Sequence, residues 1–380
     1  MSGAPRRLIY LSGTRADFGL LQSTLQRVQA MPQLSVQILV TGMHLSAEHG
    51  HTVDEVRASG LPICELLPLD MRTRDGRSMA QGIADCISGV ARVLERERPD
   101  LLLVLGDRGE MLAGAIAALH LGVPCVHIHG GERSGTVDEP VRHAISKLSA
   151  YHLVATEGSR LRLIAMGEEP DRIHVTGAPG LDDLSTLPLM APQECMEALG
   201  LPAGSPFILS VFHPVVQQAG LAAGQTQAVL QALRNVGLPV LWVEPNADAG
   251  SIEILRALDE TSLPAGSRRL AHVPRPLFAA ALRDARLMVG NSSSGIIEAA
   301  SFGTPVVNIG DRQRSRERSA NVVDVSCEAG AIEAAVRAAL SGARGPCDNV
   351  YGDGMAGARI AQLLARLPLG PAVLEKTNTY

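Results

Sequence analysis

The chain has 380 residues, of which 46% are hydrophobic and 19% charged, and its formal net charge is −5. This composition is typical of a soluble globular protein that is long enough for two α/β domains. The negative charge argues against nucleic acid as a partner. The apolar runs fall short of the roughly 20 residues that a membrane-spanning helix needs, and the first residues lack the pattern of a signal peptide. We therefore expect a cytoplasmic protein with no membrane contact.

Strand and helix patterns alternate along the chain. Strands are expected at residues 8–11, 36–40, 63–68, 101–105, 123–128, 151–155 and 173–175 and, after a segment rich in Gly and Pro (residues 176–192), at 207–212, 240–243, 269–271, 287–289 and 305–309. Helices are expected at residues 20–30, 52–59, 79–96, 110–121, 226–236, 276–284, 294–302 and 355–364. Apolar strands that alternate with helices are typical of parallel sheets buried on both faces.

Two such series in succession predict the fold class. We expect an α/β protein with two doubly wound, Rossmann-like domains that face each other across a cleft, as in the GT-B fold. The boundary is expected in the Gly- and Pro-rich segment, so that residues 1–185 form the first domain and residues 186–380 the second. The last expected helix, residues 355–364, is expected to pack back on the first domain.

The fourth and fifth expected strands carry the strongest signal for a site. Gly106 ends one of these strands and is followed directly by Asp107, and the next strand is followed by His129 and Glu132. Carboxyl ends of neighbouring parallel strands lie at one edge of the sheet, where open α/β sheets bind their ligands. An acid and a base at this edge favour an active site.

Two loops have features of phosphate binding. In SGTRADFG, Gly13 permits a tight turn and Arg15 offers a guanidinium group, although a solvated turn is the alternative. The sequence NSSSG, residues 291–295, opens an expected helix, where backbone N–H groups can bind an anion; an ordinary helix cap is the alternative. Glu298 follows one turn later and can accept hydrogen bonds from both hydroxyls of a ribose. The second loop therefore favours a nucleoside diphosphate.

Other features are weaker when taken alone. His213 follows a strand, with a structural histidine as the alternative, and the arginines of residues 312–318 follow another, with a solvated face as the alternative. The histidines of residues 44–51 lack the carboxylate pattern of a zinc site, so no metal is expected. The sequence has neither a nicotinamide fingerprint nor a Walker loop, and we expect no cofactor.

Several ordered motifs resemble those of the UDP-N-acetylglucosamine 2-epimerases, most closely of the hydrolysing branch. They are SGTRADFG, GDR, GGERSGTVDEPVRHAISKLS, FHP, EPNADAGS, GNSSSGIIEAASFGTPVVNIGDRQ and RERSANV, spread over residues 8–340. The resemblance implies that the first domain holds the sugar and the catalytic residues and that the second binds UDP. It also implies a cytoplasmic enzyme of sialic or legionaminic acid biosynthesis that binds a nucleotide sugar and forms a homodimer or a dimer of dimers.

The resemblance also implies residue roles. The catalytic set is Asp107, Asp138, His129, Glu132, Arg142 and His44. The set that binds substrate and UDP is Arg15, Arg108, His213, Asn246, His272, Val273, Ser292, Ser293, Ser294, Gly295, Glu298 and Arg312. One departure stands out, because the family usually has a catalytic glutamate where this chain has His129, in HIHGG. Histidine can exchange protons near neutral pH, and Glu132 is the alternative for this role.

The implied reaction converts UDP-GlcNAc and water to UDP and N-acetylmannosamine. A base removes the C2 proton as UDP leaves C1, and the resulting 2-acetamidoglucal undergoes syn hydration with the proton returning to C2 from the other face. The first alternative is a hydrolysing 2-epimerase of UDP- or GDP-linked N,N'-diacetylbacillosamine. The others are a non-hydrolysing UDP-GlcNAc 2-epimerase, a GT-B glycosyltransferase and an inactive nucleotide-sugar sensor. SGTVDE followed by RHAISKLS favours the hydrolysing branch.

Overall fold

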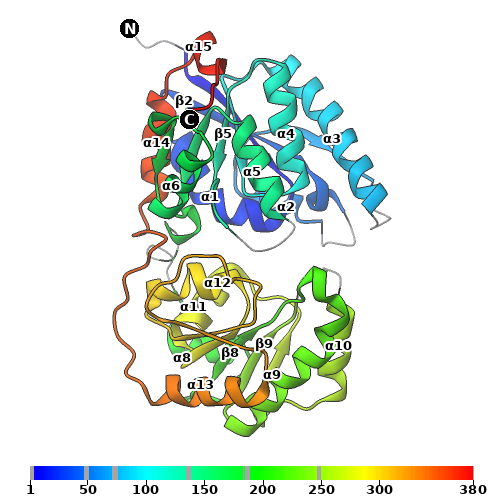
Figure 1. Ribbon diagram of the computed structural model, residues 1–380, viewed down its shortest axis with the longest axis vertical. Helices are drawn as coiled ribbons and strands as arrows, with labels where there is room; N and C mark the ends of the chain where they lie inside the picture. Colours follow the sequence, from blue (N-terminus) through cyan, green and yellow to red (C-terminus); the bar gives the residue numbers. More distant parts are fainter. Residues whose placement is uncertain are drawn as a thin grey trace. The chain divides into compact units, whose positions relative to one another are not determined.

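The computed structural model describes residues 4–46, 51–70, 76–133, 138–182, 184, 189–245 and 250–379. The chain divides into two compact units, which are described separately. Unit 1 comprises Met1–Arg133, Val137–Asp183 and Tyr351–Tyr380, and unit 2 comprises Ser134–Thr136 and Leu184–Val350. Each unit is a sheet with helices on both faces (Figure 1), so the predicted α/β class with two doubly wound domains is confirmed.

Within the described residues, the sheet of unit 1 has seven parallel strands in the order β3-β2-β1-β4-β5-β6-β7. The strands are β1 (Arg6–Ser12), β2 (Leu34–Thr41), β3 (Ile63–Leu67), β4 (Leu101–Leu105), β5 (Cys125–Ile128), β6 (Tyr151–Val154) and β7 (Ile173–Val175). In β1, Leu8 packs into one layer of the core and the next residue, Ile9, into the other. Both faces are covered, which is why residues 8–11 at the centre of β1 are apolar and buried. The strand order reverses between β1 and β4, and open sheets of this kind bind ligands at such a point.

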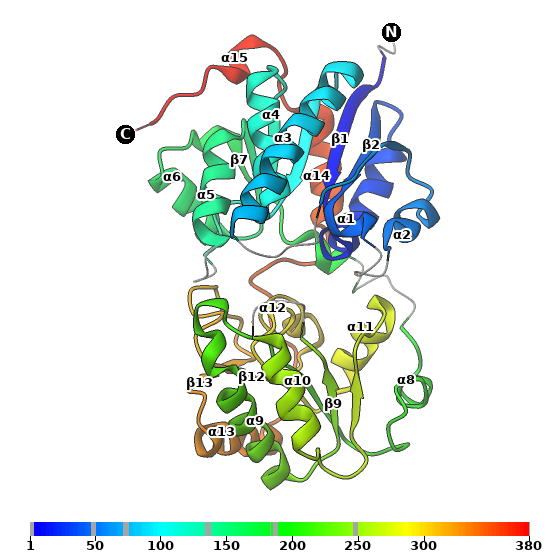
Figure 2. The same ribbon diagram turned by 90° about the vertical axis from the view of Figure 1, so that its right-hand side faces the viewer.

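The helices of unit 1 form two layers (Figure 2). They are α1 (Arg15–Gln29), α2 (Val53–Ala58), α3 (Gly76–Glu97), α4 (Gly109–His120), α5 (Asp138–Leu148), α6 (Glu157–Ala165), α14 (Ala356–Arg366) and α15 (Pro371–Leu374), with short 3-10 helices at η1 (Gly42–Leu45), η3 (Pro170–Arg172) and η4 (Pro179–Leu181). Helices α1, α2 and α14 pack into one core cluster, and α3, α4 and α5 into the other. The tertiary structure thus brings α14, near the end of the chain, against α1, near its start.

The last residues of the chain hold one end of α5. The Nζ of Lys376 donates hydrogen bonds to the carbonyl oxygens of Ser146, Lys147 and Ser149 at 2.9, 2.9 and 2.8 Å. The same ammonium group lies 2.5 Å from a carboxylate oxygen of Glu168, which is buried. The last carbonyl groups of a helix have no partner within the helix, so Lys376 acts as a cap for α5.

Among the described residues of unit 2, six parallel strands lie in the order β10-β9-β8-β11-β12-β13. They are β8 (Ile208–Val211), β9 (Val240–Val243), β10 (Arg268–Leu270), β11 (Leu287–Gly290), β12 (Val306–Ile309) and β13 (Val322–Val325). The helices are α8 (Pro192–Ala198), α9 (Ala222–Val236), α10 (Ser251–Glu260), α11 (Arg275–Asp284), α12 (Ser293–Ile297) and α13 (Ala329–Ser341), with η5 (Val216–Leu221) and η6 (Ala299–Phe302). Helices α9, α10 and α13 cover one face, and α8 and α11 the other. The strand order reverses between β8 and β11.

Some elements differ from the sequence-based expectation. Helix α1 begins at Arg15, five residues earlier than expected, because Thr14 caps it. The single helix expected over residues 294–302 is interrupted at Glu298, where α12 ends and η6 begins. Helices α5, α6, α8, α10 and α13 and strand β13 were not predicted. Every helix in the described ranges is too short or too polar to cross a bilayer.

Candidate active site

Four side chains form a line of contacts at the carboxyl edge of the unit 1 sheet. The Nδ1 of His129 lies 2.7 Å from the Oε1 of Glu132, and the Oε2 of Glu132 lies 3.7 Å from the Nη1 of Arg142. Arg142 in turn donates through Nη2 to the Oδ2 of Asp107. Glu132 and Arg142 are 5% and 4% exposed, so these charges interact with little screening by solvent. We refer to these four residues as the contact line.

The loop that carries His129 has an uncommon backbone. The φ angle of His129 is 62°, in the left-handed region that few residues other than glycine adopt. Gly131 also has a positive φ of 71°, and a Cβ there would lie 2.6 Å from the carbonyl oxygen of Ser159 in α6. Arg162, also in α6, donates to the carbonyl oxygen of Gly131. Helix α6 therefore supports the loop from behind, and backbone strain of this kind is often found at functional sites.

His127 connects three parts of the same edge. Its Nε2 lies 2.7 Å from the carbonyl oxygen of Gly106, and its Nδ1 lies 3.0 Å from the Oγ of Ser146 in α5. A carbonyl oxygen only accepts, so Nε2 carries the hydrogen and Nδ1 accepts from the hydroxyl. Burial lowers the pKa of His127 to about 3, and the ring stays neutral at physiological pH. His127 thus orients the turn before Asp107 but cannot exchange protons there.

The contact line leaves several polar atoms for a ligand. When Glu132 accepts the hydrogen on Nδ1, the neutral His129 ring presents Nε2 as a proton acceptor. The Nε and Nη1 of Arg142 are buried and have no hydrogen-bond partner among the described residues. Buried donors of this kind usually have a partner, and a substrate oxygen would provide one. Asp138 opens α5 on the same edge; its side chain lies outside the described part of the structure.

His44 was predicted to be catalytic, but its surroundings favour a structural role. Its Nε2 lies 2.9 Å from the Oγ of Ser12, and its Nδ1 lies 2.8 Å from the Oγ1 of Thr52. The side chain is fully buried, and its ring meets Phe18 edge to face at 6.2 Å. Burial lowers the pKa of His44. Because both ring nitrogens are already engaged, we leave His44 out of the catalytic set.

The first expected phosphate loop is already occupied by a carboxylate of the chain itself. The Oδ2 of Asp17 accepts hydrogen bonds from the backbone N–H groups of Gly13 and Thr14 at 3.1 and 2.7 Å. The sequence did not reveal this, because Asp17 reads equally well as a solvated loop residue. Arg15 is the first residue of α1 and lies 3.7 Å from Glu55 in an exposed ion pair. The backbone N–H groups of Gly13 and Thr14 are therefore already engaged, and the phosphate contact expected of this loop stays a prediction for Arg15.

Arg108 follows Asp107 and occupies the N-cap position of α4, where its side chain makes no capping hydrogen bond. Its Nε lies 3.4 Å from the Oε2 of Glu110, and its Nη2 lies 3.7 Å from the Sδ of Met43. The side chain of Arg108 is 43% exposed. A phosphate oxygen is a good acceptor for such a group.

In unit 2, His213 and Asn291 connect the ends of β8 and β11, the two strands between which the strand order reverses. The backbone N–H of His213, after β8, donates to the Oδ1 of Asn291 at 2.7 Å. The side-chain amide of Asn291, after β11, returns a hydrogen bond to the carbonyl oxygen of His213 at 2.8 Å. Arg312 and Gln313 both donate to the carbonyl oxygen of Asn291 at 3.0 Å. Burial, and then the charge of Arg312, lower the pKa of His213 to about 3, so its ring is neutral.

The serine loop follows directly. The Oγ of Ser292 accepts from the backbone N–H of Ser294 at 3.3 Å and lies 2.9 Å from its hydroxyl. Because α12 has only five residues, individual N–H groups, rather than a long helix dipole, are available for an anion. The Oε2 of Glu298 lies 2.6 Å from the Nη1 of Arg275. Arg275 was not predicted; its place at the start of α11, just after β10, is the signal that could have revealed it.

The remaining predicted residues are less informative. His272 is exposed and Val273 is buried, and both lie between β10 and α11. Asn246 falls outside the described residues. Within the described ranges, no group of three or more His, Cys, Asp or Glu residues is arranged to hold a metal ion.

The family model described as UDP-N-acetylglucosamine 2-epimerase matches residues 26–365. The chain belongs to this family. The match extends from α1 of unit 1 through the whole of unit 2 to α14, so it includes the elements that carry both groups of residues described above. The resemblance inferred from the ordered motifs is thereby confirmed.

Individual relatives agree with this assignment. This epimerase-family chain is 46% identical over 375 residues to a UDP-N,N'-diacetylbacillosamine 2-epimerase (hydrolyzing) of Legionella pneumophila, covering 99% of this chain and 100% of the relative. It is 35% identical to a UDP-N-acetylglucosamine 2-epimerase of Neisseria meningitidis, covering 92% and 91%. In fold, it resembles the crystal structure of UDP-GlcNAc 2-epimerase from Neisseria meningitidis bound to UDP-GlcNAc, with a TM-score of 0.80 at 20% identity over 94% of this chain and 99% of that one.

Proposed function

We propose that the protein is a hydrolysing 2-epimerase that converts a UDP-linked 2-acetamido sugar and water into UDP and the free 2-epimer. The observation that carries this proposal is the contact line of unit 1, in which buried Glu132 and Arg142 connect His129 to Asp107 at one edge of the sheet. Removal and return of a proton at C2 requires such groups. The names of the relatives that are 46% and 35% identical support epimerase chemistry.

For the sugar, we place UDP-N,N'-diacetylbacillosamine ahead of UDP-GlcNAc. The relative named for the former is 46% identical over nearly the whole of both chains, against 35% for the relative named for the latter. This reverses the order that the motifs alone favour. UDP-GlcNAc stays the second candidate because the second relative is also matched over most of its length. Either product would enter the biosynthesis of a sialic-type or legionaminic-type acid.

In the proposed mechanism, His129 and the carboxylates exchange protons at C2. A base removes the C2 proton, the C1–O bond breaks and UDP leaves with the bonding electrons, giving the 2-acetamidoglucal. The oxygen of water then adds at C1, and a proton returns to C2 from the opposite face. We propose that the groups that carry out these two proton transfers are among His129 (through Nε2), Asp107 and Asp138. Arg142 fixes Asp107 and donates to a substrate oxygen, and Glu132 orients His129.

We propose that residues of unit 2 bind UDP. The diphosphate is assigned to the N–H groups and hydroxyls of Ser292, Ser293 and Ser294 with Gly295, and to Arg312. The ribose hydroxyls are assigned to the carboxylate of Glu298, which Arg275 holds in place. His213, Asn246, His272 and Val273 complete the proposed nucleotide set, and Arg15 and Arg108 of unit 1 are proposed to contact phosphate. We further propose that the enzyme is cytoplasmic and acts as a homodimer or a dimer of dimers.

The reaction itself provides the first test. In D₂O, incubation with UDP-N,N'-diacetylbacillosamine, or with UDP-GlcNAc as the second substrate, should release UDP and a free 2-epimerised sugar. That sugar should carry deuterium at C2, because elimination removes the original proton and solvent supplies the new one. Proton NMR and mass spectrometry of the product measure both features.

Other outcomes of this assay point elsewhere. A stable UDP-linked 2-epimer would identify a non-hydrolysing enzyme, and release of UDP with the C2 proton retained would indicate simple hydrolysis or sugar transfer. Tight binding of UDP-sugars without any turnover would leave an inactive sensor as the better description.

A second prediction concerns the nucleotide. Glu298→Ala should weaken UDP binding by about 2 kcal/mol, or roughly 30-fold, because the ribose hydroxyls lose their buried acceptor. Calorimetry with UDP measures this change. Glu260→Gln removes the charge of an exposed glutamate in the same unit and should leave the affinity unchanged. Equal affinities in the two variants would contradict the assignment of Glu298 to the ribose.

A further inference from the structure

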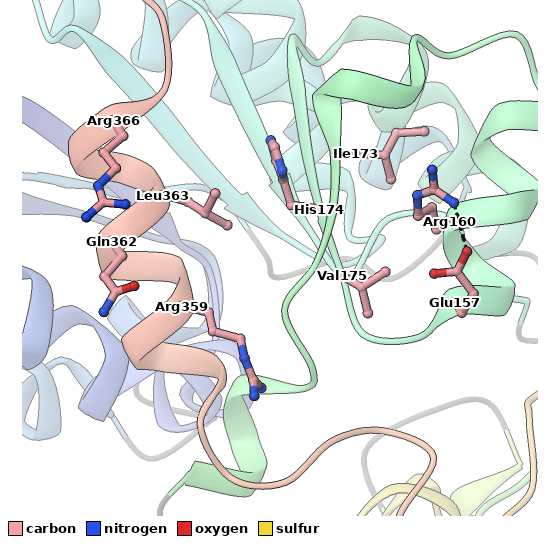
Figure 3. Close-up of a pocket in the computed structure, with 9 residues that line it drawn as sticks. All are labelled: Glu157, Arg160, Ile173, His174, Val175, Arg359, Gln362, Leu363 and Arg366. Carbon is pink, nitrogen blue, oxygen red and sulfur yellow. Dashed lines mark hydrogen bonds and ion pairs between the residues drawn. The ribbon is translucent and has the colours of Figure 1, made fainter.

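A pocket of about 470 Å³ lies in unit 1 beside β7, the edge strand of the sheet. Figure 3 shows Arg359, Gln362 and Arg366 along α14 on one side and Arg160 with Glu157 on α6 on the other. None of these residues belongs to the contact line or to the nucleotide set. The volume is within the range of pockets that bind small organic ligands.

The charged residues that line this pocket are three arginines and one glutamate, in a protein whose net charge is −5. Arg160 is paired with Glu157 at 2.8 Å on the same helix. Arg359 makes two hydrogen bonds of 2.7 Å to Asp353. Both pairs are at least partly exposed to solvent. The Arg160–Glu157 pair has a single contact and is weak, whereas the two contacts between Arg359 and Asp353 make that pair the firmer one. Arg366 forms no ion pair with any described residue, and the pocket therefore has cationic charge to offer.

The other lining groups suit an organic ligand rather than a bare ion. The Nε2 of His174 is shielded from solvent and has no hydrogen-bond partner among the described residues. Burial lowers the pKa of His174, which favours the neutral ring. Ile173 and Leu363 add apolar surface, and Gln362 adds an amide. Arginine forks match the two oxygens of a carboxylate or phosphate, and apolar groups with neutral donors match the body of a sugar.

We propose that this pocket binds a sugar-sized organic anion bearing a carboxylate or a phosphate, and that binding is communicated to the catalytic loop through α6. Glu157 and Arg160 on α6 line the pocket. Arg162, on the same helix, donates to the carbonyl oxygen of Gly131, and Gly131 lies so close to α6 that a Cβ there would clash with the backbone of Ser159. A shift of α6 on anion binding therefore moves the loop between His129 and Glu132.

Calorimetry tests the binding site without relying on turnover. Glucuronate, glucose 6-phosphate and inorganic phosphate are titrated separately, each with and without saturating UDP so that binding at the nucleotide residues is distinguished. At least one of the two sugar anions should bind with one-to-one stoichiometry and a Kd below about 1 mM. Arg366→Gln should weaken this binding at least about tenfold. Arg27→Gln, which changes an exposed arginine of α1, should not change it.

The response to the three probes identifies the ligand chemistry. Preference for glucuronate indicates a carboxylate, and preference for glucose 6-phosphate indicates a phosphate. Binding of inorganic phosphate as tight as that of both sugar anions would overturn the assignment to a sugar-sized ligand. Absence of binding by all three probes, or equal binding to Arg366→Gln and Arg27→Gln, would overturn the site itself.

Turnover tests the connection through α6. The preferred anion should change turnover of the wild type at subsaturating UDP-sugar by about fivefold or more. Arg366→Gln should keep the basal turnover and lose this response, since Arg366 contacts neither the contact line nor the nucleotide set. Anion binding that leaves turnover of the wild type unchanged would overturn the coupling, whether or not the proposed substrate is correct.

Discussion

Replacing Asp107 with Asn should lower turnover of the UDP-sugar by a factor on the order of 10² or more, as expected for a group that transfers a proton. The amide is nearly the same size but can neither take up nor release a proton at C2. UDP affinity should be kept, because Asp107 is not among the residues that we propose to bind UDP. Initial rates of UDP release, together with calorimetry for UDP, separate the two effects.

Two further variants make this result specific. Asp85→Asn changes an exposed aspartate of α3 in the same unit and should turn over normally. Asp138→Asn should behave like Asp107→Asn if both carboxylates take part. Arg142 is buried and loses one of its two charged partners in Asp107→Asn, so thermal unfolding has to be compared with the wild type. A folded Asp107→Asn variant with near-normal turnover would reject Asp107 as a catalytic residue.

The second large effect is expected at His129. His129→Asn should reduce turnover at least about 10²-fold while the protein stays folded. Asparagine tolerates a positive φ at least as well as histidine, and its amide nitrogen can still donate to Glu132. The substitution therefore removes mainly the Nε2 that we assign to proton exchange. Initial rates of UDP release measure the loss, and thermal unfolding checks that the variant stays folded.

A double substitution examines why this chain has histidine where its family usually has glutamate. His129→Glu alone would place a second carboxylate beside Glu132, and we expect it to be nearly inactive because like charges repel. Adding Glu132→Gln removes that repulsion and leaves a donor for the new carboxylate, so His129→Glu/Glu132→Gln should regain part of the activity. If the single variant is as active as the double one, Glu132 does not act on position 129 in the way we propose.

The strands were predictable because their signal is local. In β4 every residue is apolar and buried, and the predicted bounds of β4, β7 and β9 agree with the structure. A parallel strand buried on both faces needs such a run whatever its neighbours are. The ends of β4, β5, β8 and β11 were predicted on the same basis. The sequence therefore placed Asp107, His129, His213 and Asn291 at strand ends before any contact was known.

The helices that were not predicted show the limit of this signal. Helix α5 was not predicted, and its end is held by Lys376 through hydrogen bonds to residues more than 220 positions earlier in the sequence. Helix α12 ends at Ile297, and Glu298, which belongs to the same apparent helical pattern, pairs through its carboxylate with Arg275 in α11. Local periodicity carries no information on such tertiary partners.

By itself, the sequence determined the fold class, the family and the set of residues at the strand ends, because burial patterns and ordered motifs are properties of short segments. Only the tertiary structure decided which groups meet. Arg142 contacts Asp107, which lies 35 positions earlier in the sequence. The carboxylate of Asp17 accepts a hydrogen bond from the backbone N–H of Gly13, a group that the sequence analysis assigned to a phosphate. Hydrogen bonds and ion pairs depend on distances of a few ångströms between segments remote in the chain, and these distances are set by strand order and helix packing.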